Sequence, residues 1–264
     1  ETNEANEANE ANEANEERKY LDLVKYIYNN NKFNKGEKDE INLLLKLFHL
    51  NNLKRYDKLV EIFGNEANEG IIILDINTKC IITDIKKIIE HKSLFKADCI
   101  IQMKNTKFEY RISIKSKNGA YPTILNHTPR TANVFINGYL SKNVPSLDIL
   151  LNEYIDKRKT KYIGEDISLC KLECVKDNLQ IKECLKEVIS YFIFDGSGKG
   201  DSKCKSNSLL FYKNNTIKFI KCFNLEEKKK YVETILNNCI ISLRDKGMPK
   251  KIKAENKPWI FNDY

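Results

Sequence analysis

The chain has 264 residues, a mass of 30.8 kDa and a mean hydropathy of −0.52. Its residues are 41% hydrophobic and 31% charged, which is typical of a globular protein with enough chain to bury a sizeable core. This composition excludes collagen-like and fully disordered chains. It also excludes a membrane partner, because no apolar run approaches the roughly 20 residues that cross a bilayer.

The charge is unevenly distributed along the chain. Lysine and arginine total 45 against 37 acidic residues, a net charge of +8, and seven of the acids lie in the first seventeen residues. The remainder carries 45 basic against 30 acidic residues, a net charge of +15. Basic side chains neutralise phosphates and release condensed counterions, so this balance favours a polyanionic partner such as nucleic acid.

Eight cysteines are scattered through the sequence. Disulfide frameworks are typical of small secreted chains, whereas this chain is long, lysine-rich and without a signal-peptide pattern. We therefore expect reduced thiols in an intracellular, cytoplasmic protein. The spacing of Cys170, Cys174 and Cys184 lacks the second half of a zinc site, so buried thiols explain these cysteines better.

The first residues differ from the rest of the chain. Residues 1–17 repeat Asn-Glu-Ala with a period of three and carry no large apolar side chain. Alanine and glutamate favour a helix, but the recurrent asparagine opposes it. With nothing to bury, this segment is predicted to be an acidic, disordered tail. Residues 18–264 are predicted to form a single domain, because no Pro- or Gly-rich linker divides them.

Apolar residues recur at helical spacing in several segments. The predicted helices cover residues 21–28, 41–48, 53–63, 84–89, 147–154, 179–191 and 225–243. Residues 71–74 and 80–82 are short β-branched runs. They fit either a hairpin or the boundary between a helix and another element, and the pattern leaves both open.

Strand patterns predict two further hairpins. Residues 99–103 and 108–114 flank a polar turn, and residues 209–212 and 217–220 flank an Asn-Asn turn. Helices lie before, between and after these hairpins. The order predicts an α/β or α+β fold with a mixed central sheet flanked by helices.

The first hairpin brings two charged residues to one end. Asp98 heads one strand and Lys115 ends its neighbour, and in an antiparallel pair those ends lie together. Ser113 projects to the same face as Lys115, because side chains alternate along a strand. A carboxylate that holds Mg²⁺ and a lysine that activates water suit phosphodiester hydrolysis. Two solvated charges at ordinary strand ends are the alternative, and spacing alone leaves both open.

This segment, residues 96–116, resembles the PD-(D/E)xK nucleases, and within them the type II restriction endonucleases. The family's pattern is an acidic residue, a hairpin and then acidic-x-Lys. Asp98 followed by Ser113-Ile114-Lys115 is similar to it, with Ala97 in place of proline, and the resemblance covers roughly residues 96–135.

The resemblance implies a restriction-endonuclease-like fold and sequence-specific cleavage of double-stranded DNA with Mg²⁺ as the cofactor. Asp98 would hold the metal, and Lys115 would orient and activate the attacking water. Such enzymes commonly act as dimers, so the resemblance also implies a homodimer.

One position departs from the family's pattern. Ser113 stands where an acid is usual, so a second carboxylate must come from elsewhere. The candidates are Glu66, Glu69, Glu90 and Glu109. Family members often add a glutamate from a helix before the hairpin, and Glu69 is the expected donor. The alternative is a noncatalytic nucleic-acid-binding protein on a nuclease-like scaffold, because a decayed active site would also lack this acid.

A polar, glycine-containing loop follows Lys115. Asparagine can bond adenine and arginine can bond guanine at their base edges. The residues expected to contact DNA are Ser116, Lys117, Asn118, Thr123, Asn126, His127, Thr128 and Arg130. An ordinary polar loop is the alternative. The glycine-rich residues 195–203 lack the spacing of a phosphate-binding loop and precede a hairpin, so nucleotide binding is not expected there.

Overall fold

The computed structural model describes residues 2–90, 93, 95–116, 179–197, 200–213 and 216–238. The chain divides into two compact units. The first comprises Glu1–Pro122 and Ser206–Lys221, and the second comprises Thr123–Lys205 and Cys222–Tyr264. The sequence predicts one domain from residue 18 onward. In chain order, most of the second unit lies between the two segments of the first.

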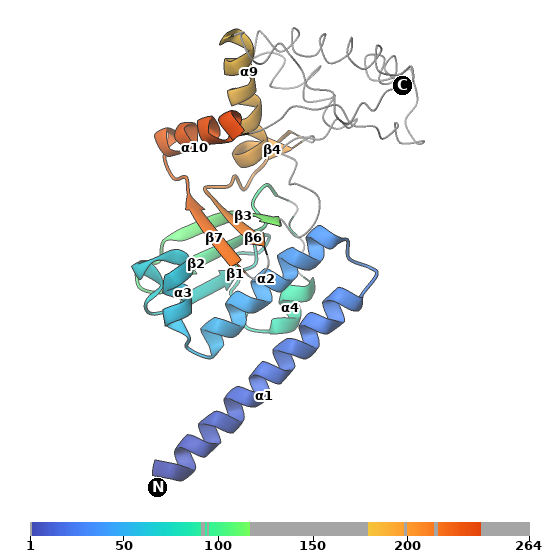
Figure 1. The fold of residues 1–264 in the computed structure, drawn as a ribbon, viewed down its shortest axis with the longest axis vertical. Helices are drawn as coiled ribbons and strands as arrows, with labels where there is room; N and C mark the ends of the chain where they lie inside the picture. Colours follow the sequence, from blue (N-terminus) through green and yellow to red (C-terminus); the bar gives the residue numbers. More distant parts are fainter. Residues whose placement is uncertain are drawn as a thin grey trace. The chain divides into compact units, whose positions relative to one another are not determined.

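The first unit is built on a five-stranded mixed sheet (Figure 1). In pairing order its strands are β1 (Ile71–Leu74), β2 (Cys99–Met103), β3 (Glu109–Ser116), β6 (Ser208–Lys213) and β7 (Thr216–Lys221). Neighbouring strands are antiparallel except β3 and β6, which are parallel. The predicted mixed sheet flanked by helices is confirmed, and both predicted hairpins form. Residues 71–74 and 80–82 fit either a hairpin or a helix boundary in the sequence. In the structure, residues 71–74 form β1, and its Leu74 also forms an isolated bridge with Ile81.

Helices of the first unit flank this sheet, with α1 packed on α2 (Figure 1). They are α1 (Thr2–Asn29), α2 (Lys35–Asn52), α3 (Tyr56–Phe63), the single turn η1 (Asn65–Ala67) and α4 (Ile85–Glu90). The sequence predicts a one-sided apolar stripe for residues 41–48. In the structure every residue of that run except Lys46 is buried. Helix α2 contacts β3, α1, α3 and α4, which is why it is buried on nearly all sides.

The start of α2 is fixed by a reciprocal pair of hydrogen bonds. The Asn34 side chain accepts from the backbone N–H of Glu37 at 3.0 Å, and the Glu37 carboxylate accepts from the backbone N–H of Asn34 at 2.8 Å. Such a capping box satisfies helix-end donors that otherwise lack partners. It determines where the first turns of α2 begin, and therefore where Asp39 and Glu40 lie.

The acidic repeat is helical in the structure. Helix α1 runs from Thr2 to Asn29, whereas the sequence predicts a disordered tail over residues 1–17. Residues 11–15 are exposed, in agreement with a solvated segment, and the helical propensity of alanine and glutamate accounts for the backbone. The helix is tied to α2 where His49 Nε2 lies 2.6 Å from Glu17 and the His49 ring stacks on Tyr20 at 4.6 Å between centroids.

In the second unit the structure describes two helices and a short strand pair. Helix α9 (Leu179–Ser190) continues into a wider turn, η3 (Tyr191–Asp195), and the strands β4 (Gly196–Ser197) and β5 (Gly200–Asp201) follow before α10 (Leu225–Asn238). Helices α9 and α10 confirm the predicted helices at these places, while the predicted helix at residues 147–154 lies outside the described residues.

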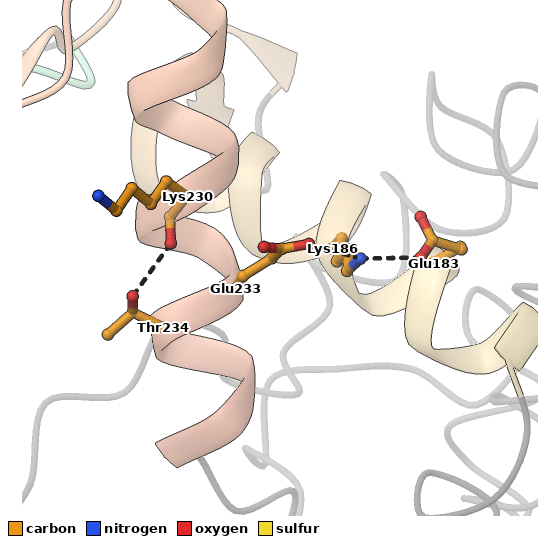
Figure 2. Close-up of polar contacts among 5 residues, drawn as sticks. All are labelled: Glu183, Lys186, Lys230, Glu233 and Thr234. Atoms are coloured by element: carbon orange, nitrogen blue, oxygen red, sulfur yellow. Dashed lines mark hydrogen bonds and ion pairs between the residues drawn. The ribbon is translucent and has the colours of Figure 1, made fainter.

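An ion-pair network joins the two helices of the second unit. The Lys186 ammonium on α9 lies 2.9 Å from Glu183 and 3.0 Å from Glu233 on α10. Figure 2 shows this lysine between the two carboxylates, with Thr234 donating to the Lys230 carbonyl on α10. Phe194 packs edge-on against Tyr231, and the Lys228 ammonium lies over the Phe194 ring. These aromatic contacts supply apolar packing that the exposed ion pairs alone would not.

Gly70, the residue before β1, tests how closely β1 packs against α2 and α3. Gly70 has a φ of +95°, and a Cβ there would lie 2.6 Å from Asn51 Oδ1 and 2.8 Å from Tyr56 Cε1. We expect Gly70→Ala to lower the free energy of unfolding by about 2 kcal/mol, measured by urea denaturation.

Gly36→Ala is the matched control. Gly36 lies in the first turn of α2, and the nearest atom to its added Cβ is Asn34 Oδ1 at 3.4 Å. Alanine is a better helix former than glycine by about 1 kcal/mol, so this change should be neutral or stabilising. Equal losses in the two variants would contradict the packing described for Gly70.

Candidate active site

Asp98 lies immediately before β2 and is held against β3. Its Oδ2 accepts a hydrogen bond from the backbone N–H of Ile114 at 2.6 Å and one from the Ser113 hydroxyl at 3.3 Å. Its own backbone N–H donates to the Ile112 carbonyl at 2.7 Å, which extends the ladder between β2 and β3. Two donors on one oxygen fix the orientation of this carboxylate.

Lys115 follows on the same strand, two positions after Ser113. Ser113 is almost completely buried, whereas Lys115 is only partly buried. Side chains alternate along β3, so the two residues share a face. The structure thus brings Asp98, Ser113 and Lys115 to one end of the β2–β3 hairpin, as the sequence predicts.

Helix α2 brings a second carboxylate to this place. Burial raises the pKa of Glu40 to about 8, and the Asp98 carboxylate adds to the rise while the Lys115 ammonium opposes it. Charges act this strongly only over short distances in a partly desolvated environment. Glu40, Asp98 and Lys115 therefore form one electrostatic group, contributed by α2, by the residue before β2 and by the end of β3.

The same two carboxylates, Asp98 and Glu40, affect the pKa of the Cys99 thiol. Burial raises the pKa of Cys99 well above its usual range, and Asp98 and Glu40 both add to the effect. Cys99 is fully buried, so its thiol is neutral and serves as packing. The charges of Asp98 and Glu40 therefore both act on the Cys99 thiol.

The structure places Glu69, the expected second carboxylate, away from Asp98. Glu69 precedes β1, and the first residue of β1, Ile71, pairs with Met103 at the far end of β2 from Asp98. Five residues of strand separate those ends, on the order of 15 Å. Glu69 and Asp98 are therefore not brought together.

Two other candidates have partners at that far end. Glu66 accepts a hydrogen bond from the Tyr110 hydroxyl and forms an ion pair with Lys221 at 3.1 Å. Glu109 pairs with Lys79 at 3.8 Å. The remaining candidate, Glu90, is the last residue of α4.

A sequence signal for Glu40 does exist. Glu40 stands four and seven residues before Leu44 and Leu47, which places it on the same stripe of α2 as these core residues. A carboxylate on a core-facing stripe must find charged or hydrogen-bonding neighbours. A search of the helix for carboxylates on its core-facing stripe would have marked Glu40 as a candidate, without showing that it lies near Asp98.

Of the residues predicted to contact DNA, the structure describes Ser116 alone. Ser116 is the last residue of β3, and its hydroxyl donates to the Asp39 carboxylate. The remaining predicted residues, Lys117, Asn118, Thr123, Asn126, His127, Thr128 and Arg130, lie outside the described residues.

The other sequence motifs give no second site within the described ranges. The glycine-rich segment contains β4 and β5, and Asp195 pairs with Lys205 at 3.4 Å, so no helix N-terminus follows these glycines. The cysteines whose side chains are described, Cys80, Cys99, Cys204 and Cys222, are free thiols. Among residues that the structure describes, no three His, Cys, Asp or Glu side chains are grouped to hold a metal ion.

The raised pKa of Glu40 predicts a pH dependence of stability. Below pH 4.5 the residue is protonated in both the folded and the unfolded chain. Between pH 4.5 and about 8 the unfolded chain loses this proton and the folded chain keeps it, so the free energy of unfolding falls as pH rises. We expect Glu40→Gln in EDTA to match the wild type near pH 4.5 and to be more stable at pH 8, by on the order of 3 kcal/mol.

Urea denaturation at several pH values measures this difference. Glu69→Gln is the matched control, because Glu69 is exposed and lies at the other end of the sheet. Its profile should parallel that of the wild type. A Glu40→Gln profile that also ran parallel would show that Glu40 is not held in the protonated form.

Comparison with known proteins identifies no relative. No protein-family model, curated protein or solved structure matches this chain significantly. Within the described segments, no helix has both the length and the apolar character needed to cross a bilayer. The chemistry available to this protein is therefore judged from the Glu40, Asp98 and Lys115 group itself.

Proposed function

We propose that this protein is a Mg²⁺-dependent endonuclease that hydrolyses phosphodiester bonds in double-stranded DNA. The observation that carries the proposal is that Asp98 lies at the end of the β2–β3 hairpin that also holds Lys115, while the contact between Asp39 and Ser116 brings the neighbouring Glu40 to the same end. Two carboxylates and a lysine are side chains that suit metal-assisted hydrolysis of a phosphodiester. Glu40 also lies on a helix before the hairpin, where the resemblance to PD-(D/E)xK nucleases leads us to expect the second acid.

The residues present fit a magnesium ion. Mg²⁺ takes oxygen ligands and is usually held by one or two carboxylates together with water and substrate phosphate, so it needs no group of three protein acids. Asp98 and Glu40 provide two carboxylates, and their mutual repulsion is what a divalent cation would relieve. When bound, Mg²⁺ would polarise a phosphate oxygen and stabilise the charge that develops on it.

The other residues of the site have distinct roles. Lys115 would hold the attacking water and the phosphate through its ammonium hydrogens, and it adds positive charge where negative charge develops. Water adds to phosphorus and the bond to one sugar oxygen breaks, which leaves a phosphate on one product and a hydroxyl on the other. Ser113 stands in the usual acidic position, and its hydroxyl helps the Ile114 N–H to orient Asp98.

Duplex DNA is the proposed substrate because the chain beyond residue 17 carries a net charge of +15. Residues 116–130 would supply part of the sequence readout, as in a type II restriction enzyme. Two copies of the chain would place one site on each strand. The free thiols support a reducing, intracellular compartment.

A noncatalytic nucleic-acid-binding protein is the second candidate. The observation that favours it is Ser113, which is buried and contributes a hydroxyl where the family usually contributes a carboxylate. In this alternative the basic side chains of the protein bind DNA, and Asp98 and Lys115 are present but do not catalyse cleavage.

Cleavage assays distinguish these functions. Incubation of unmethylated plasmid and phage DNA with the protein should give discrete fragments with MgCl₂ and intact DNA with EDTA. Asp98→Asn, Lys115→Ala and Glu40→Gln should each reduce the cleavage rate by at least about 10²-fold. Ser113→Ala should have a small effect because the Ile114 N–H still holds Asp98, and Glu69→Gln should have none.

DNA affinity at two salt concentrations completes the test. Salt-sensitive binding without cleavage on any substrate would favour the noncatalytic alternative. Full cleavage by Lys115→Ala or Glu40→Gln would contradict the proposed site. A chain that neither binds nor cleaves DNA would contradict both candidate functions.

A further inference from the structure

A buried polar network lies directly beside the proposed site. Asp39 is 2% exposed, and both of its carboxylate oxygens accept hydrogen bonds. Oδ1 accepts from the Tyr28 hydroxyl on α1 at 2.8 Å, and Oδ2 accepts from the Ser116 hydroxyl at the end of β3. A buried carboxylate is retained at a cost to stability, which makes its position informative.

The two ends of this contact adjoin the proposed functional residues. Asp39 precedes Glu40 on α2, and Ser116 follows Lys115 on β3. Consecutive Cα atoms are about 3.8 Å apart, so a contact between Asp39 and Ser116 constrains the distance between their neighbours. A slide of α2 along β3 by one helical turn would move Glu40 by about 5.4 Å and break this contact.

The network extends to a further strand of the sheet. The Asn42 side chain donates to the Tyr212 hydroxyl at 2.9 Å and to the Tyr28 hydroxyl at 3.4 Å. Tyr212 on β6 is the parallel-strand neighbour of Ser116. Burial raises the pKa of both tyrosines, so their hydroxyls stay protonated and remain able to donate.

We propose that Asp39 is a positioning residue, which locks α2 onto the end of β3 through Ser116 and Tyr28 and thereby sets the spacing between Glu40 and Lys115. This inference rests on the proposed function of the Glu40, Asp98 and Lys115 site. It assigns Ser116 a role inside the protein, in place of the DNA contact predicted from the sequence. Residues that orient metal ligands through such contacts commonly change metal affinity by 10- to 100-fold when replaced.

The test compares Asp39→Asn and Ser116→Ala with Ser116→Thr in the full chain. Thermal unfolding during a MgCl₂ titration gives the concentration for half-maximal stabilisation. We expect Asp39→Asn to raise this concentration about tenfold and Ser116→Ala to raise it less, while Ser116→Thr keeps the hydroxyl and stays near the wild type. DNA affinity measured in EDTA should remain within about twofold of the wild type, because the phosphate contacts that dominate affinity are unchanged.

Two further measurements separate positioning from a loss of stability. Gly70→Ala, at the other end of the sheet, is the destabilised control and should leave the half-maximal MgCl₂ concentration unchanged. Hydrogen–deuterium exchange without metal should be at least about tenfold faster in Asp39→Asn at the end of β3 and in the first turns of α2, with β1 unaffected.

The outcomes are distinct. Unchanged exchange in Asp39→Asn would overturn the inference whatever the metal data show. Faster exchange with an unchanged MgCl₂ requirement would show that Asp39 is only structural, which also overturns it. If the wild type itself shows neither MgCl₂ stabilisation nor cleavage, the proposed function fails. The exchange data would then decide separately whether Asp39 locks α2 onto β3.

Discussion

Helix α2 carries two neighbouring carboxylates in the first unit, of which Asp39 is buried and Glu40 is partly buried. The structure accommodates them in different ways. Asp39 accepts hydrogen bonds from one hydroxyl on α1 and one on β3. Burial raises the pKa of Glu40, and neighbouring carboxylates, with Asp98 the largest of them, add to the rise against the Lys115 ammonium. The unfavourable electrostatics of the buried helix are thus concentrated at one end of the β2–β3 hairpin, where a cation would relieve them.

The parts of the fold that follow from short stretches of sequence could be predicted. Strand β2 occupies the predicted residues 99–103, because an apolar run next to a polar turn is a local signal. Asp98 and Lys115 meet because a single hairpin joins them. Glu40 could not be placed in this way, since its proximity to Asp98 depends on how α2 packs across the sheet.

Ser113 affects the charge balance of the site as well as the hydrogen bonding of Asp98. Its side chain is almost fully buried beside Asp98. A carboxylate at that position would add a further negative group to a partly desolvated space that already contains Asp98 and Glu40. With serine there, the site holds two carboxylates, and the one supplied by α2 already resists ionisation. The hydroxyl therefore helps to orient Asp98 without adding a negative charge beside it.

The parallel pairing of β3 with β6 has a consequence for how the chain folds. Leu210 pairs with Phe219 across a nearby turn, but it pairs with Ile114 only after the chain has passed through the inserted residues of the second unit. Closing a loop roughly ten times longer costs about 2 kcal/mol more in chain entropy. During synthesis, β1, β2 and β3 leave the ribosome well before β6 exists. Until then the edge of β3 has unpaired backbone groups, so the nascent protein depends on α2 and on its own hairpin to remain folded at the place where Asp98 and Lys115 meet.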